Sequence, residues 1–215
     1  GTLTIHESFG TATWIHPSQL EVDIASSRLE YYERPASLPD VEDSTLQEDL
    51  YRRDFTINAM AIQLNEPNFG ALVDPFSGQL DLYDKTIKVL HNLSFVEDPT
   101  RILRAVRFET RFQFKMDDQS KTLALHSIEK MKDVSANRII YEIKRMFQEE
   151  DVIQSMRRLY ELNFWQQYTG DSSYKSEAIT QVTKLHQLYK QVNQLDHSNV
   201  WFAYFCVPFY VSNDI

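Results

Sequence analysis

Four arginines recur at intervals of three or four residues in one segment of the chain, EDPTRILRAVRFETR. These arginines are Arg101, Arg104, Arg107 and Arg111. If the segment is a helix, they occupy a sector of about 120° on one side of it, and Asp98 lies beside that sector. The spacing leaves two interpretations open. The arginines form either a solvent-exposed face with exchangeable salt bridges, or a clamp whose guanidinium groups bind phosphate oxygens in pairs.

A second polar cluster lies in the segment DLYRRDFTINAM, residues 49–60. Its members that could bind an anion or a sugar hydroxyl are Arg52, Arg53, Asp54, Thr56 and Asn58. Thr45 and Glu48 have the form of a capping box, so a short helix is predicted to start near Ser44 and to end at this cluster. A polar helix terminus with a capping aspartate would explain the same residues, so the cluster alone does not decide between a structural and a binding role.

The elements that must position these clusters differ between the two halves of the chain. Up to about residue 95, short runs of alternating apolar and polar residues predict strands, for example over 20–25 and 60–64. From residue 100 to residue 200 there is no proline and a single glycine. Apolar residues there recur every three or four positions. Helices are predicted over 100–112, 119–131, 136–149, 151–163 and 174–195. The expected fold class is therefore an α+β head followed by an all-helical region.

The composition of the whole chain limits the choice of function. With 215 residues, 42% of them apolar, the chain is long enough to bury a core. A formal net charge of -9 argues against uniform coating of nucleic acid, although a local basic patch can still hold phosphates. One cysteine, no signal pattern and no apolar run long enough for a bilayer lead us to expect a cytoplasmic protein without a membrane partner.

The two polar segments, taken in order, resemble motifs of a known family. RRDFTINAM at 52–60 and EDPTRILRAVRF at 97–108 are similar to two motifs of the class II tRNA nucleotidyltransferase and bacterial poly(A) polymerase family. HESFGTAT at 6–13, VDIASSR at 22–28 and LPDV at 38–41 resemble further parts of that family's head.

Two more segments extend the resemblance. DPFSGQLDL at 74–82 resembles the family's flexible linker, where two glycines are usual and Ser77 replaces the first, which is expected to stiffen the turn. ANRI at 136–139, with Glu142, matches the last neck motif more weakly.

The resemblance implies a polymerase-β-type head and a helical neck in which protein side chains act as the template. Asp98 and Arg101 would read the base, because cytosine and adenine each present an amino donor beside a ring-nitrogen acceptor. Uracil and guanine reverse that order, which would leave buried groups unpaired. The other roles implied by the resemblance are triphosphate binding for Arg53, Arg104 and Arg107, the ribose hydroxyl for Asp54, positioning for Asn58, and RNA or phosphate for Arg28, Arg52 and Arg138. For Arg28, a surface ion pair with Glu30 is the open alternative.

The resemblance also implies Mg²⁺ as the cofactor. Phosphoryl transfer of this type uses carboxylates that hold two metal ions, and the family carries them as Asp-x-Asp after a Gly-Gly-x-x-Arg-Asp turn. Neither motif occurs in this sequence, so the expectation is that both lie before Gly1 and that this chain alone is catalytically incomplete. By resemblance Asp23 is a supporting carboxylate near the metals, with a plain edge-strand acid as the alternative. Glu21 and Asp23, on one face of a strand, are a weaker substitute for the metal pair.

The expected organisation is a remainder of the head over 1–95, a neck with a nucleotide-recognition helix over 96–150, and the start of a helical body over 151–215. The implied activity is template-independent addition of C and/or A, from CTP and ATP, to the 3′ end of tRNA. An A-adding or CC-adding specialist and a poly(A) polymerase remain open. The alternative from another class is a non-catalytic module that binds a nucleotide or tRNA.

Overall fold

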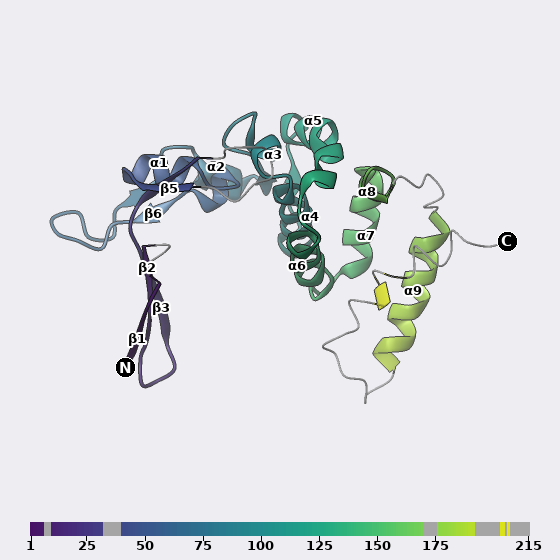
Figure 1. Ribbon diagram of the computed structural model, residues 1–215, viewed down its shortest axis with the longest axis horizontal. Helices are drawn as coiled ribbons and strands as arrows, with labels where there is room; N and C mark the ends of the chain where they lie inside the picture. Colours follow the sequence, from purple (N-terminus) through teal and green to yellow (C-terminus); the bar gives the residue numbers. More distant parts are fainter. Residues whose placement is uncertain (7–9, 32–39, 170–175, 192–202, 205, 207–215) are drawn as a thin grey trace.

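A strand-rich part at the N-terminal end of the chain leads into a series of helices (Figure 1). The computed structural model describes residues 1–6, 10–31, 40–169, 176–191, 203, 204 and 206. Parts of the predicted motifs at 6–13 and 38–41, and the ends of the predicted helix at 174–195, lie outside these residues. The predicted α+β head followed by an all-helical region is confirmed. None of the helices in the described part of the chain is long and apolar enough to cross a membrane.

The first three strands form an antiparallel sheet in the order β1-β2-β3. They are β1 Thr2–His6, β2 Thr11–Ile15 and β3 Glu21–Ala25. The register pairs Leu3 with Trp14 and Trp14 with Val22, so one face of the sheet is apolar, whereas Thr13 and Asp23 pair on the other face. The alternation over 20–25 therefore predicted a strand correctly.

The sequence RRDFTIN, residues 52–58 and called the RRDFTIN segment below, follows a short strand pair and a capped helix. Strand β4 Arg28–Tyr31 pairs with β5 Asp40–Asp43, and α1 spans Leu46–Tyr51. Both halves of the predicted capping box are present. The Glu48 N–H donates to Thr45 Oγ1 at 3.3 Å, and the Thr45 N–H donates to Glu48 Oε2 at 3.1 Å. This cap fixes where α1 begins and hence where Arg52, Arg53 and Asp54 lie at its C-terminal end.

Short elements form the end of this segment and connect it to the helix that carries Arg101, Arg104, Arg107 and Arg111. They are η2 Thr56–Asn58, β6 Ala61–Ile62, β7 Leu72–Val73, α2 Gly78–Tyr83, β8 Thr86–Ile87 and α3 Ser94–Glu97. The predicted strand over 60–64 is wrong in its extent, because β6 ends at Ile62. Gln63 still pairs across the hairpin, its N–H donating to the Ala71 carbonyl at 2.9 Å and its carbonyl accepting from the Gly70 N–H at 2.7 Å, and the chain turns back between Gln63 and Gly70. Ser77 adopts a left-handed φ of 60°, a conformation that favours glycine.

The linker segment packs directly against the RRDFTIN segment. Thr56 Oγ1 donates to Asp81 Oδ2 at 2.6 Å, and α2 packs against η2. A Cβ added at Gly78 would lie 2.2 Å from the Thr56 carbonyl oxygen, so a glycine is needed there for close approach. Asp74 holds the start of α2 by accepting from the Gly78 and Gln79 N–H groups at 2.7 and 2.9 Å.

The first helix predicted in the helical region is α4, which spans Thr100–Phe112 as predicted. The other elements are β9 Lys115–Met116, α5 Asp118–Ser127, η3 Ile128–Asp133, α6 Ala136–Phe147, α7 Val152–Glu161, α8 Phe164–Thr169 and α9 Ser176–Gln191. Helix α4 packs against α6 and α7, and its residues Ile102, Leu103 and Val106 are fully buried. The predicted helix at 119–131 instead ends at Ser127 and continues as the 3₁₀ helix η3. Helix α8 was not predicted.

Candidate nucleotide-binding site

A polar cavity of about 990 Å³ lies where the C-terminal end of α1 meets α4 and α6. The predicted site residues that line it are Arg52, Arg53, Asp54, Asn58, Asp98, Arg101, Arg104, Arg107 and Arg138. Asp23 and Arg28 do not line it. The two motifs, far apart in the sequence, therefore contribute to one site.

The lining of this cavity is strongly positive although the chain is acidic overall. Eight arginines and four carboxylates line it, which gives a formal net charge of +4. A nucleoside triphosphate carries roughly four negative charges, so the lining complements such a ligand. Burying so many guanidinium groups without a ligand is unfavourable unless each finds an anion or another acceptor.

Asp54 and Arg104 join the RRDFTIN segment to α4. The Asp54 carboxylate is 7% exposed, and its Oδ2 accepts from both Nε and Nη2 of Arg104, with the Nε distance at 2.8 Å. Its Oδ1 accepts from the Asn58 amide at 2.9 Å and from the Phe55 N–H at 3.0 Å. Burial lowers the pKa of Arg104, but the Asp54 carboxylate more than offsets this and the pKa lies above its ordinary value.

Asp98 and Arg101 are held at the start of α4. Asp98 Oδ1 accepts from the Thr100 N–H at 3.0 Å and hydroxyl at 2.6 Å, and forms an ion pair with Arg138 Nη2 at 2.9 Å. Arg101 is 5% exposed and donates from Nη1 to Ser94 Oγ at 2.8 Å and from Nη2 to the Arg52 carbonyl at 2.7 Å. A guanidinium has five N–H groups, so Arg101 keeps donors beyond these two bonds.

Arg107 and Glu142 are the least well satisfied groups of the cavity. The Arg107 side chain is 4% exposed, and its Nε has no hydrogen-bond partner among the described residues. Its Nη1 lies 3.9 Å from Glu149 Oε1. Its guanidinium carbon lies 4.9 Å from the centre of the Phe108 ring. Burial, followed by repulsion from Arg145, lowers the pKa of Arg107. An anion in the cavity would relieve both effects.

Glu142 of α6 was not predicted as a site residue. It is 6% exposed, and in the described part of the chain its Oε2 has no hydrogen-bond partner, while its Oε1 lies 3.8 Å from Arg104 Nη1. Burial raises the pKa of Glu142 in spite of the surrounding arginines. Other lining residues missed by sequence reasoning are Glu30, Tyr141 and Arg145. The signal for the α6 members was their spacing, since positions 138, 141, 142 and 145 share one side of a helix.

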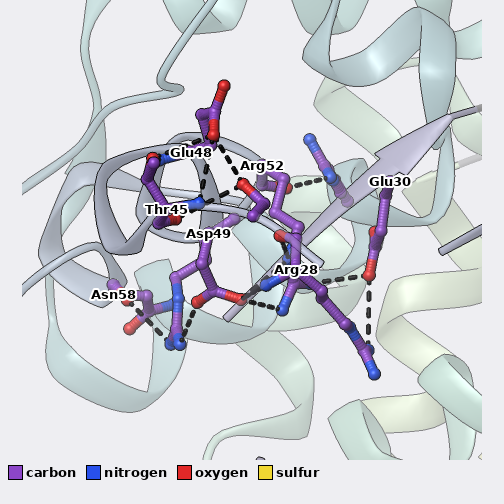
Figure 2. A network of polar contacts seen from close by, with 10 residues as sticks. Arg28, Glu30, Thr45, Glu48, Asp49, Arg52 and Asn58 are labelled. Atoms are coloured by element: carbon purple, nitrogen blue, oxygen red, sulfur yellow. Dashed lines mark hydrogen bonds and ion pairs between the residues drawn. The ribbon is translucent and has the colours of Figure 1, made fainter. Parts of the chain in front are cut away.

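Arg28 and Arg52 belong to a network beside the cavity (Figure 2). Arg52 donates to Glu30 Oε1 at 2.6 Å, to Asp49 Oδ1 at 2.6 Å and to the Arg28 carbonyl at 3.0 Å. The Arg28 guanidinium lies 3.3 Å from Glu30 Oε1, which is the surface ion pair left open as its alternative role. Arg53, whose side chain is 43% exposed, lies 3.0 Å from Asp49 Oδ2. A role in RNA binding for Arg28 and Arg52 stays a prediction.

Asp23 lies apart from this site, on the polar face of β3. It is exposed, and its Oδ1 accepts from the Thr13 hydroxyl at 2.7 Å. Within the described ranges, no group of three or more histidine, cysteine or acidic side chains could hold a metal ion. The residues that the structure describes therefore do not fit a Mg²⁺ site, and the metal role of Asp23 stays a prediction.

Comparisons with known proteins agree with the observed fold. Residues 1–88 match the family described as "Poly A polymerase head domain". The chain is 40% identical over 191 residues to an A-adding tRNA nucleotidyltransferase of Halalkalibacterium halodurans, covering 87% of this chain and 44% of that protein. It is 46% identical over 156 residues to the A-adding tRNA nucleotidyltransferase of Geobacter sulfurreducens, covering 72% of this chain and 18% of that protein.

A solved structure extends the likeness to the helices. A CCA-adding enzyme in complex with ATP matches with a TM-score of 0.84 and 34% identity, over 100% of this chain and 49% of that one. The matched head domain and the fold thus define a polymerase-type head followed by helices. The chain belongs to the class II CCA-adding tRNA nucleotidyltransferase family. It spans less than half the length of each of these three proteins.

Proposed function

We propose that the full-length protein adds A and/or C, from ATP and CTP, to the 3′ end of tRNA. In this proposal the present chain supplies the part of the site that binds the nucleotide and selects its base. The observation that carries the proposal is the +4 cavity in which the two motifs meet. Relatives named A-adding and a neighbour solved with ATP support it.

In this proposal Asp98 and Arg101 hold the base of the nucleotide. All three contacts of the Asp98 carboxylate among the described residues fall on Oδ1, so Oδ2 is available to accept from the amino group of adenine or cytosine. Arg101, fixed by Ser94 and the Arg52 carbonyl, donates to the ring nitrogen beside that amino group. A uracil carbonyl would face the carboxylate with no donor between them, at a cost of roughly 1 to 3 kcal/mol.

The phosphates and the ribose occupy the rest of the cavity in this proposal. A phosphate oxygen supplies the acceptor that the buried Arg107 Nε lacks, and Arg53 and Arg104 hold the remaining charge. A ribose hydroxyl donates to Asp54, whose orientation is set by Asn58 at 2.9 Å. These roles fix the nucleotide before reaction, which lowers the entropic part of the barrier to transfer.

Mg²⁺ remains part of the proposal for the full-length protein only. When bound, it would activate the attacking 3′-hydroxyl and stabilise the leaving pyrophosphate. Because the described residues offer no site for it, we assign them nucleotide binding and base selection and no step in transfer. A cytoplasmic location follows from a tRNA substrate and stays a prediction.

The test is incorporation of labelled ATP and CTP, separately and together, by the full-length protein. The acceptors are tRNA transcripts that end before CC, transcripts that end after CC, and RNAs with unrelated 3′ ends. We favour addition of A to the transcript that ends in CC, because the two relatives above are named A-adding. Addition of C, or activity on unrelated ends, would identify a CC-adding, CCA-adding or poly(A)-forming enzyme. No incorporation with any acceptor would contradict the proposal and leave a nucleotide-binding module.

A further inference from the structure

Arg138 lies where helix stability does not explain it. It is the third residue of α6, and the N-cap Ser135 makes no side-chain hydrogen bond to the first turn. The N-terminus of a helix carries partial positive charge, so an arginine in the first turn is unfavourable there by itself. The Asp98 carboxylate is an acidic partner that offsets this charge, and its Oδ1 lies 2.9 Å from Arg138 Nη2.

The contact fixes one oxygen of the Asp98 carboxylate. Oδ1 accepts from the N–H and the hydroxyl of Thr100 and forms an ion pair with Arg138 Nη2, so two different elements hold the same oxygen. A carboxylate with two hydrogen bonds and one ion pair on the same oxygen cannot rotate without breaking them. Its second oxygen, Oδ2, is thereby held in one place.

We propose that Arg138 is a positioning residue for base selection, which locks the Asp98 carboxylate through Oδ1 so that Oδ2 accepts from the amino group of the incoming base. This inference rests on the proposed function, and it replaces the RNA contact expected for Arg138 from the sequence. Arg138 touches no reacting atom in this role. It acts through Asp98, because the orientation of a single acceptor decides whether an amino group or a carbonyl fits.

The two side chains are placed so that this lock can be effective. Asp98 is 16% exposed and Arg138 is 27% exposed, and both line the cavity. The pair is therefore sheltered enough to hold its geometry. A salt bridge that only joined α4 to α6 would not need to lie on the residue that faces the base.

The experiment measures nucleotide selectivity in the full-length protein with Arg138→Ala, Arg138→Lys and Asp98→Ala. The readout is kcat/KM for ATP and for UTP on a tRNA transcript ending in CC, together with the KM for that tRNA. We expect Arg138→Ala to reduce the preference for ATP over UTP by about tenfold, which is the factor associated with one charge-assisted hydrogen bond at a partly exposed site. Arg138→Lys keeps a donor and should recover most of the preference.

The matched control is Lys144→Ala on the same helix. Lys144 is exposed and does not line the cavity, so its loss should leave the ATP preference unchanged. The double variant Asp98→Ala with Arg138→Ala should be no less selective than Asp98→Ala alone, because the proposed effect of Arg138 on base selection passes through that carboxylate.

Two results would overturn the inference. One is a raised KM for tRNA with an unchanged ATP preference in Arg138→Ala, which would assign the arginine to RNA. The other is independent losses of selectivity that multiply in the double variant. If the wild-type protein incorporates no nucleotide, the proposed function fails. Equilibrium titration of the same variants then gives the ratio of the ATP and UTP dissociation constants. This ratio still tests whether Arg138 positions the Asp98 carboxylate.

Discussion

The ion pair between Asp54 and Arg104 is expected to hold the RRDFTIN segment against α4. Replacing Asp54 by alanine removes the acceptor for Arg104 Nε at 2.8 Å and for the Asn58 amide at 2.9 Å. Breaking a fully buried pair costs about 3 to 5 kcal/mol, because the remaining charge is left without its partner. The Arg104 side chain is 30% exposed and water can reach it, so we expect a loss of about 2 to 3 kcal/mol.

The assay is urea unfolding of Asp54→Ala, Arg104→Ala and the double variant, followed by circular dichroism. The coupling free energy between the two positions is expected to be about 2 kcal/mol, since each single change removes the same interaction. Arg157→Ala is the control, because Arg157 is an exposed arginine on α7, and its loss should change stability by no more than about 0.5 kcal/mol. If the two single losses simply add in the double variant, the pair does not act as a unit and the reasoning is refuted.

Two further changes test the packing and the electrostatics around the cavity. Glu142→Gln should stabilise the chain at pH 7, because burial raises the pKa of Glu142 and the wild type loses stability as the pH rises above the ordinary glutamate value of 4.5. Urea titrations at pH 4 and pH 7 check this, and a larger gain at pH 4 would contradict it. Gly78→Ala should destabilise the chain by about 2 kcal/mol, because the new Cβ would lie 2.2 Å from the Thr56 carbonyl. Ser77→Ala is its control, because it changes the neighbouring residue without adding a Cβ at position 78. Equal thermal midpoints for the two variants would show that α2 moves away from Thr56 at no cost and would contradict this prediction.

The sequence was most informative where the spacing of apolar residues agrees with a local signal for the start of a helix. Helix α4 begins at Thr100 and ends at Phe112 as predicted, because Pro99 precedes it and its apolar residues repeat every three or four positions. The capping box at Thr45 predicted the start of α1 for the same reason. Short strands were harder, since a two-residue strand such as β6 has no measurable alternation and depends on its partner β7.

The site was predictable in its members but not in their pairing. Nine of the eleven predicted residues line one cavity, yet the ion pairs of Arg104 with Asp54 and of Arg138 with Asp98 join segments forty or more residues apart. Local spacing carries no information about such contacts, because they depend on how distant segments pack together, as α4 does against α6. The same packing buries Glu142, which appeared in the sequence only as part of a weak motif.

In the proposed function Asp98 selects the base while the neighbouring arginines hold the phosphates. The most direct measurement is the ratio of UTP and ATP dissociation constants for the wild-type protein and Asp98→Ala. We expect this ratio to fall close to one in the variant, while ATP affinity drops by no more than about tenfold, because the triphosphate contacts remain. An unchanged ratio, with ATP still preferred over UTP, would contradict it.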